Sequence, residues 1–323
     1  MWRRPTIKIF VILLLTQLVL PASTSKMSAN EIVITTPKTH QKTKKLWART
    51  YHELTESNQS VRGGTFIAPL EGNGYKDKLH HSGARNTIIF VPQSVNFEIP
   101  IDLIFFFHGL NGFKERDFKT RVLRHTKSLS LTNPNYILII PEMPWSVNTS
   151  TPRKRQGRVF NRKNKFSMFV NSTVAVIVAI FDPSDKRANL CIKKNICHLK
   201  FGDVILLGHS AGGSALKSIS STGGMDELYT KFGAKSVKVI FSDAGYGRWT
   251  ETTWKHFKLK NKTSTEFLLL TRKWDRPYNN TKKFLKKFKR LPKNIRHQVF
   301  DRKKMTHGDI GDQALTWTYS LPE

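Results

Sequence analysis

Cysteine is nearly absent from this chain of 323 residues, and the shortage limits its chemistry. Only Cys191 and Cys197 occur, within "CIKKNIC". No second Cys/His pair lies at a suitable spacing, so no metal site is predicted. In an oxidising compartment two cysteines this close can close a small surface loop. A disulfide is the favoured prediction, and two free thiols are the alternative.

Acidic residues are also scarce: 23 Asp and Glu stand against 54 Lys and Arg, a formal net charge of +31. Such a charge attracts polyanions and negatively charged surfaces through its long-range field. No zinc finger, RNA-recognition or helix-turn-helix pattern accompanies it, so no specific nucleic-acid partner is predicted. The alternatives are an anionic surface of the cell envelope or a solvated, lysine-rich surface without a partner.

Long apolar runs are missing except near the N-terminus. Arg3, Arg4 and Lys8 precede an apolar stretch at residues 9–20, and small residues follow it. This stretch is shorter than the ~20 residues that a membrane span needs. The pattern predicts a signal peptide over residues 1–25, with an uncleaved anchor as the alternative. We therefore expect an exported protein, periplasmic or secreted, with no transmembrane span in the mature chain.

The rest of the chain predicts a basic, loosely ordered lead-in at 26–60 and one domain at 61–323, without internal repeats. Several apolar runs are hydrophobic at nearly every position, as in strands covered on both faces of a parallel sheet. The alternation of strands and helices predicts an α/β class with a doubly wound, mostly parallel sheet and helices on both faces. Strands are predicted at 86–92, 101–109, 136–142, 203–209, 236–243, 266–271 and 296–300, and helices at 114–131, 166–181, 211–221, 279–290 and after 308.

The sequence "VILLGHSAGGSAL" places a G-x-S-x-G motif, Gly208 to Gly212, between a buried strand and a helix. Side chains at the two glycines would collide with the neighbouring strand and helix where the chain reverses. Such a turn lifts the hydroxyl of Ser210 into the open, as a nucleophile requires. The alternative is a small residue at an ordinary strand-to-helix turn.

A second motif, "FFFHGLNGF", ends another buried strand at His108 and Gly109. Acyl transfer creates a negatively charged tetrahedral oxygen, which two aligned backbone N–H groups stabilise. The N–H of Ala211 is one predicted donor of this oxyanion hole. The other is that of Leu110 or Asn111. An ordinary turn is the alternative interpretation.

With these two motifs, residues 86–320 resemble the α/β-hydrolase family. The resemblance implies a nucleophile, acid and histidine in that chain order, without a metal or cofactor. It nominates Ser210 as the nucleophile, His307 as the base and Asp275, in "EFLLLTRKWDRP", as the acid. Asp243 is the reserve acid, since some members of the family take theirs from that position. Tyr246 and Arg248 are predicted to face the substrate beside Asp243.

The favoured function is therefore an exported serine hydrolase that cleaves a carboxylic ester of a small-molecule, lipid or cell-envelope substrate through an acyl-enzyme on Ser210. An amidase or peptidase of the same fold that acts on cell-wall peptides is one alternative. A non-catalytic polyanion-binding protein is the other. The basic helix pattern at 279–290 favours an ordinary helix with buried phenylalanines over a membrane-surface helix.

Overall fold

The computed structural model describes residues 32–33, 48–56, 59–70, 85–92, 95–110, 129, 133, 135–143, 159–181, 199–257 and 265–319. The chain divides into two compact units, Met1–Asn30 and Glu31–Glu323, and all described residues belong to the second. The predicted signal peptide, both cysteines and the predicted helix at 114–131, apart from Leu129, lie outside the described residues. The signal peptide and the disulfide therefore stay predictions.

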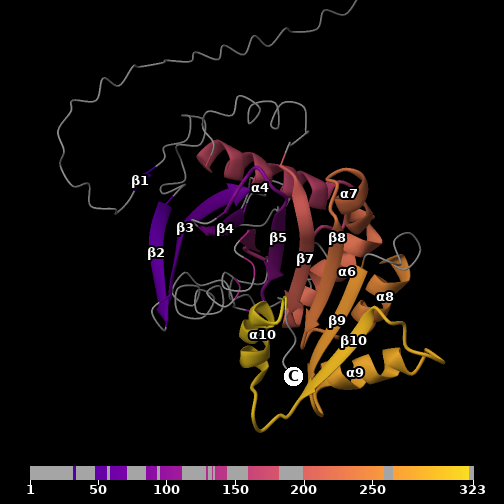
Figure 1. The fold of residues 1–323 in the computed structure, drawn as a ribbon. Helices are drawn as coiled ribbons and strands as arrows, with labels where there is room; N and C mark the ends of the chain where they lie inside the picture. The colour runs from indigo at the N-terminus through magenta and orange to yellow at the C-terminus, as the bar shows by residue number, and fades with distance from the viewer. Residues whose placement is uncertain are drawn as a thin grey trace, which may run out of the picture. The chain divides into compact units, whose positions relative to one another are not determined.

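One sheet organises the second unit (Figure 1), with the strand order β1-β2-β3-β4-β6-β5-β7-β8-β9-β10. Strands β1 to β4 and the β4–β6 pair are antiparallel, whereas β6, β5, β7, β8, β9 and β10 run parallel to one another. The strands are β1 (Ile32–Val33), β2 (Ala48–Glu56), β3 (Gln59–Leu70), β4 (Arg85–Pro92), β5 (Ile101–Phe107), β6 (Tyr136–Pro141), β7 (Phe201–His209), β8 (Ser236–Ser242), β9 (Thr265–Arg272) and β10 (Ile295–Phe300).

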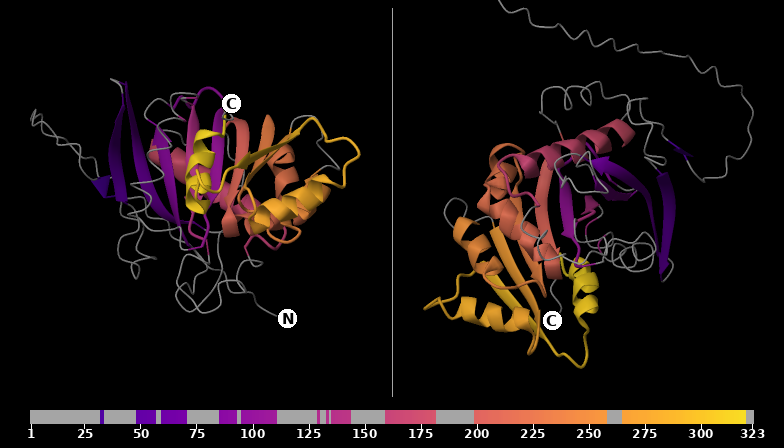
Figure 2. Two further views of the ribbon diagram at one scale, coloured as in Figure 1. Left: turned by 90° about the horizontal axis from the view of Figure 1, so that it is seen from below. Right: turned by 180° about the vertical axis from the view of Figure 1, so that it is seen from behind.

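Helices cover both faces of this sheet (Figures 1 and 2). Along β5, Leu103, Phe105 and Phe107 belong to one apolar core, and Ile104 and Phe106 to the other, as the alternation of strand side chains requires. The first core lies under α4 (Lys165–Phe181), α6 (Gly213–Ser221), α7 (Gly224–Thr230), α8 (Trp249–Phe257) and α9 (Arg276–Leu285). The second lies under α10 (His307–Thr316). The predicted fold class is confirmed.

The predicted lead-in at 26–60 is corrected in part, because β1 and β2 fall within it. Strand β2 is held by an antiparallel ladder to β3, which runs from Arg49–Phe66 to Glu56–Gln59. That ladder consists of backbone pairing with a neighbouring strand, and no local apolar run in the sequence predicts it. The compact unit therefore begins before residue 61.

Helix α4 is confirmed despite its many β-branched residues. The basic helix at 276–285 is also an ordinary amphipathic one: Phe284 is buried, and Phe288 packs against the same core. No helix among the described residues combines the length and apolar character that a membrane crossing needs.

The topology fixes where a site should lie. After β5 the chain moves to β6 on one side, and after β7 it moves to β8 on the other. Strands β5 and β7 are direct neighbours, and the loops at their carboxyl ends are where ligands bind in open α/β sheets. The His108-Gly109 loop and Ser210 follow these two strands.

Candidate active site

Ser210 lies at the turn from β7 into α6, in the short 3₁₀ helix η3 (Ser210–Gly212). Its φ of 51° is in the left-handed region, which residues with a side chain rarely adopt. A Cβ added at Gly212 would lie 1.9 Å from the carbonyl oxygen of Phe107 on β5, and one at Gly208 would lie 2.9 Å from the backbone of Gly212. Both positions thus exclude a side chain, which gives the turn the predicted shape of a nucleophile elbow.

The His108-Gly109 loop lies directly beside this elbow. A Cβ added at Gly109 would lie 3.1 Å from Cβ of Ser210. The backbone N–H of Met143 donates to Nε2 of His108 at 3.0 Å, so the ring proton is on Nδ1, 2.6 Å from the carbonyl oxygen of Gly109. Burial lowers the pKa of His108 to about 4. A neutral imidazole therefore ties the loop after β5 to the end of β6.

The two predicted oxyanion donors follow neighbouring strands, Leu110 after β5 and Ala211 after β7. Ala211 is buried at the start of the η3–α6 turn, where backbone N–H groups have no partner within the helix. Leu110 follows Gly109 on the loop, and its side chain is exposed. The placement is compatible with the predicted role, which stays a prediction; Asn111 lies outside the described residues.

His307 is the first residue of α10, and Thr306 caps this helix. The Thr306 side chain accepts from the N–H of Asp309, whose carboxylate accepts in turn from the N–H of Thr306. This capping box fixes the first turn of the helix. Nδ1 of His307 then lies 2.6 Å from Oδ2 of Asp243.

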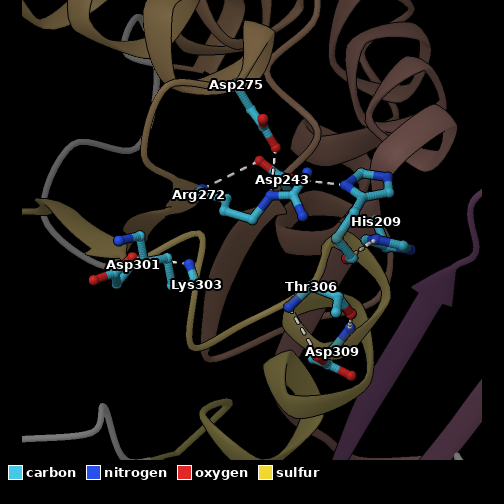
Figure 3. A network of polar contacts seen from close by, with 9 residues as sticks. His209, Asp243, Arg272, Asp275, Asp301, Lys303, Thr306 and Asp309 are labelled. Carbon is cyan, nitrogen blue, oxygen red and sulfur yellow. Dashed lines mark hydrogen bonds and ion pairs between the residues drawn. The ribbon is translucent and has the colours of Figure 1, made fainter.

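Asp243 directly follows β8, is fully buried and has a φ of 45°. Its backbone N–H donates to the carbonyl of Leu270, and its Oδ1 accepts from the N–H of Arg272 at 3.3 Å. The carboxylate is therefore held from β9 by Arg272 (Figure 3). Its second oxygen contacts His307.

The choice of Asp275 as the acid is corrected by this geometry. Its carboxylate pairs with Nε of Arg272 at 2.5 Å, and the residue is the N-cap of α9. A signal for this was present in the sequence, because Asp-Arg-Pro is a typical helix start. Asp243, the reserve acid, is the residue that contacts His307.

Of the two residues predicted to face the substrate, the structure brings one to the nucleophile. The pKa of Tyr246 is raised, mainly by burial, and the neighbouring Ser210 hydroxyl opposes that shift. Arg248 instead pairs with Glu251 through two bonds of 3.1 Å, and its side chain is 80% exposed. Contact between Arg248 and a substrate stays a prediction.

His209 is the residue that sequence reasoning passed over. Its ring centroid is 4.7 Å from that of His307, and its Nε2 is 3.0 Å from the carbonyl oxygen of His307. The residue next to the nucleophile therefore contacts the predicted base, which places Ser210 and His307 at the same edge of the sheet. Among the described residues, no group of three or more His, Cys, Asp and Glu side chains is arranged to hold a metal ion.

The strand order, the elbow after β7 and the histidine after β10 are those of the α/β-hydrolase fold, as the sequence resemblance implied. No family model and no curated protein matches the chain.

Solved structures are similar at low identity. A feruloyl esterase module from Clostridium thermocellum, a mutant complexed with sinapinate, is 13% identical with a TM-score of 0.47, over 85% of this chain and 95% of its own. An S-formylglutathione hydrolase from Agrobacterium tumefaciens is 14% identical with a TM-score of 0.40, over 82% and 96%. An α/β serine hydrolase without a lid from Xanthomonas campestris is 11% identical with a TM-score of 0.36, over 79% and 97%. At this distance their substrates say nothing about the substrate of this chain.

Proposed function

We propose that the chain is an exported serine hydrolase that cleaves a carboxylic ester through an acyl-enzyme on Ser210. The observation that carries the proposal is the 2.6 Å contact between Nδ1 of His307 and the buried carboxylate of Asp243. A buried acid on Nδ1 leaves Nε2 of the imidazole as the proton acceptor. Ser210, in a strained elbow at the same edge of the sheet, is the hydroxyl that this acceptor serves.

The chemistry proceeds in two halves. His307 Nε2 takes the proton of Ser210 as Oγ attacks the ester carbonyl, and Asp243 stabilises the imidazolium that forms. The N–H groups of Ala211 and Leu110 are the proposed donors to the oxyanion. The imidazolium then protonates the leaving alkoxide. A water molecule, deprotonated by His307, releases the acid and restores Ser210.

A fluorophosphonate probe tests this proposal, because it reacts only with an activated serine. Wild type is expected to label, and Ser210→Ala is expected not to. Ser221→Ala is the matched control: Ser221 is an exposed serine at the end of α6, the helix that follows the elbow, and its hydroxyl donates to the carbonyl of Lys217. Absence of labelling in folded wild type would favour the non-catalytic polyanion-binding alternative and overturn the proposal.

The nature of the scissile bond is a separate measurement. Short-chain esters, phospholipids and cell-wall peptides assayed together separate the proposed esterase from an amidase or peptidase, since the same three side chains serve both. We expect turnover of esters to exceed that of peptides. The reverse order would assign the amide reaction to the same site.

Export is proposed from the N-terminal segment alone, whose basic start and short apolar stretch are typical of a signal peptide. Expression of the full chain is expected to yield a mature protein that begins between residues 22 and 26. Mass spectrometry of the intact protein, with and without reductant, reads that N-terminus and the disulfide proposed between Cys191 and Cys197. An intact N-terminus in the membrane fraction would assign the segment as an anchor.

We further propose that the basic charge brings the enzyme to anionic substrates or surfaces. Residues 273–304, which run from the β9–α9 loop to the approach to His307, carry thirteen Lys and Arg and only two acidic residues, Asp275 and Asp301. The lysines of α9 and its C-terminal end are exposed, while Phe284 faces the core. This positive surface therefore lies on elements that lead into the site.

A further inference from the structure

We propose that His209 is a positioning residue, which sets the place of the His307 imidazole relative to Ser210. The inference rests on the proposed function. It starts from an unusual contact: the side chain next to the nucleophile hydrogen-bonds to the backbone of the base, 98 residues further along the chain. The segment His209-Ser210 thus carries the proposed nucleophile and also holds the backbone of the proposed base, His307.

The direction of this hydrogen bond follows from its partner. A carbonyl oxygen only accepts, so Nε2 of His209 carries the proton and donates to the carbonyl of His307 at 3.0 Å. The His307 carbonyl is in the first turn of α10, where it serves the helix ladder toward Gly311. Its second lone pair is available to a donor from outside the helix, and His209 supplies that donor.

The surroundings are shaped around this ring. A Cβ added at Gly311 on α10 would lie 2.6 Å from Cγ, Cδ2 and Nδ1 of His209, and one at Gly109 would lie 3.1 Å from Nδ1. Two elements, the loop after β5 and helix α10, therefore leave space for the imidazole where a side chain would fill it. A ring enclosed in this way has little freedom to leave the His307 carbonyl.

The ring is also kept uncharged. Burial, helped by the neighbouring His307 and His108, lowers the pKa of His209 to about 3. His307 becomes an imidazolium during the proposed reaction, with its centroid 4.7 Å from that of His209. A neutral neighbour does not oppose that charge, and Asp243 on the other side of His307 stabilises it.

A second bond fastens α10 to the sheet without touching His307. The hydroxyl of Ser242, at the end of β8, donates to the carbonyl of Ile310 at 2.9 Å. This contact holds the helix one turn further along and offers a comparison for the role of His209. Loss of either bond loosens α10, but only loss of the His209 bond releases the residue that moves the proton.

The test compares His209→Gln with His209→Asn. The glutamine amide reaches about as far as Nε2 of histidine and can donate to the His307 carbonyl, whereas the asparagine amide is one bond too short. Relative to wild type, we expect His209→Asn to lower kcat on a short-chain ester by ~10–100-fold, because misplacement by about 1 Å costs as much as ~100-fold. His209→Gln should recover kcat to within about fivefold, and KM should change little in either variant.

Ser242→Ala is the matched control, and circular dichroism verifies that each variant is folded. Equal kcat values for His209→Asn and His209→Gln would overturn the positioning role. So would a loss of kcat in Ser242→Ala equal to that in His209→Asn, since His209 would then only help to hold α10 in place. Failure of the proposed function itself is distinguishable, because wild type would then not react with the fluorophosphonate probe at all.

Discussion

At the scale of single residues, two members of the site adopt backbone conformations that disfavour side chains. Ser210 has a φ of 51° and Asp243 a φ of 45°. Each directly follows the last residue of a parallel strand, β7 and β8 respectively. Such conformations cost on the order of 1–3 kcal/mol each. In this conformation the carboxylate of Asp243 contacts His307, while Ser210 occupies the apex of the turn after β7.

Asp243→Asn should lower kcat by ~10⁴-fold, because an amide favours the wrong imidazole tautomer at His307. Asp275→Asn is the matched comparison, since it disrupts a pair with Arg272 and leaves the Asp243–His307 contact intact. We expect its kcat to stay within about tenfold of wild type, measured on the same ester. The opposite ranking would return the acid to Asp275.

Buried neutral histidines also predict how stability depends on pH. The pKa of His108 is lowered from an ordinary 6.5 to about 4, so the unfolded chain binds a proton that the folded chain rejects between these values. Its contribution to stability is complete above pH 6.5 and is lost as the pH falls toward 4, by about 1.4 kcal/mol per pH unit. Urea unfolding between pH 7 and 5 should show a shallower decline in His108→Gln than in wild type; equal slopes would contradict this.

At the scale of elements, the start of α10 joins the parts of the site. Its cap orders His307, Asp243 holds the ring from β8, and His209 holds the backbone from β7. Because three separate contacts meet within one helical turn, the position of this turn is the feature on which the proposed chemistry depends.

Gly311→Ala should therefore impair catalysis more than it affects folding. The new Cβ would meet the His209 ring at 2.6 Å and displace it from the His307 carbonyl. We expect kcat to fall ~10-fold or more, although alanine favours a helix by about 1 kcal/mol over glycine. Gly308→Ala, on the same helix, meets only the Thr306 hydroxyl at 3.9 Å and should retain kcat. Equal activities in the two variants would contradict a requirement for space at Gly311.

The elements that could be predicted from sequence are those with a strong local pattern. Strands β5, β6 and β7 are apolar at almost every position, and the elbow glycines announce the turn after β7. Strand β2 gave no such signal, because its ladder to β3 is a pairing between neighbours. The contact of His307 was predicted with the wrong carboxylate for a related reason: whether Asp243 or Asp275 faces His307 depends on how the chain leaves β8 and β9, which is a tertiary property.

At the scale of the whole molecule, the net charge of +31 remains the largest feature without a demonstrated partner. A field of this sign raises the local concentration of anionic molecules, and salt screens it over a Debye length of ~10 Å at 0.1 M. Thirteen of the basic residues lie within residues 273–304, the stretch that leads to His307.

The response of activity to salt should therefore differ between substrates. On raising the salt concentration from ~20 to ~300 mM, kcat/KM for an anionic ester should fall several-fold, whereas that for a neutral ester of the same acyl group should hardly change. Lys282→Glu with Lys283→Glu should weaken the response to salt. An equal response for the two esters would mean that the charge is a solvated surface without a role in substrate encounter.

The central claim is that His307, held by Asp243, activates Ser210. Its most direct test is mass spectrometry of the digested protein after reaction with an ester-like phosphonate. The expected result is one adduct, on Ser210, that forms rapidly in wild type and at least ~100-fold more slowly in Asp243→Asn. An adduct on another residue, or formation at the wild-type rate in Asp243→Asn, would contradict the claim.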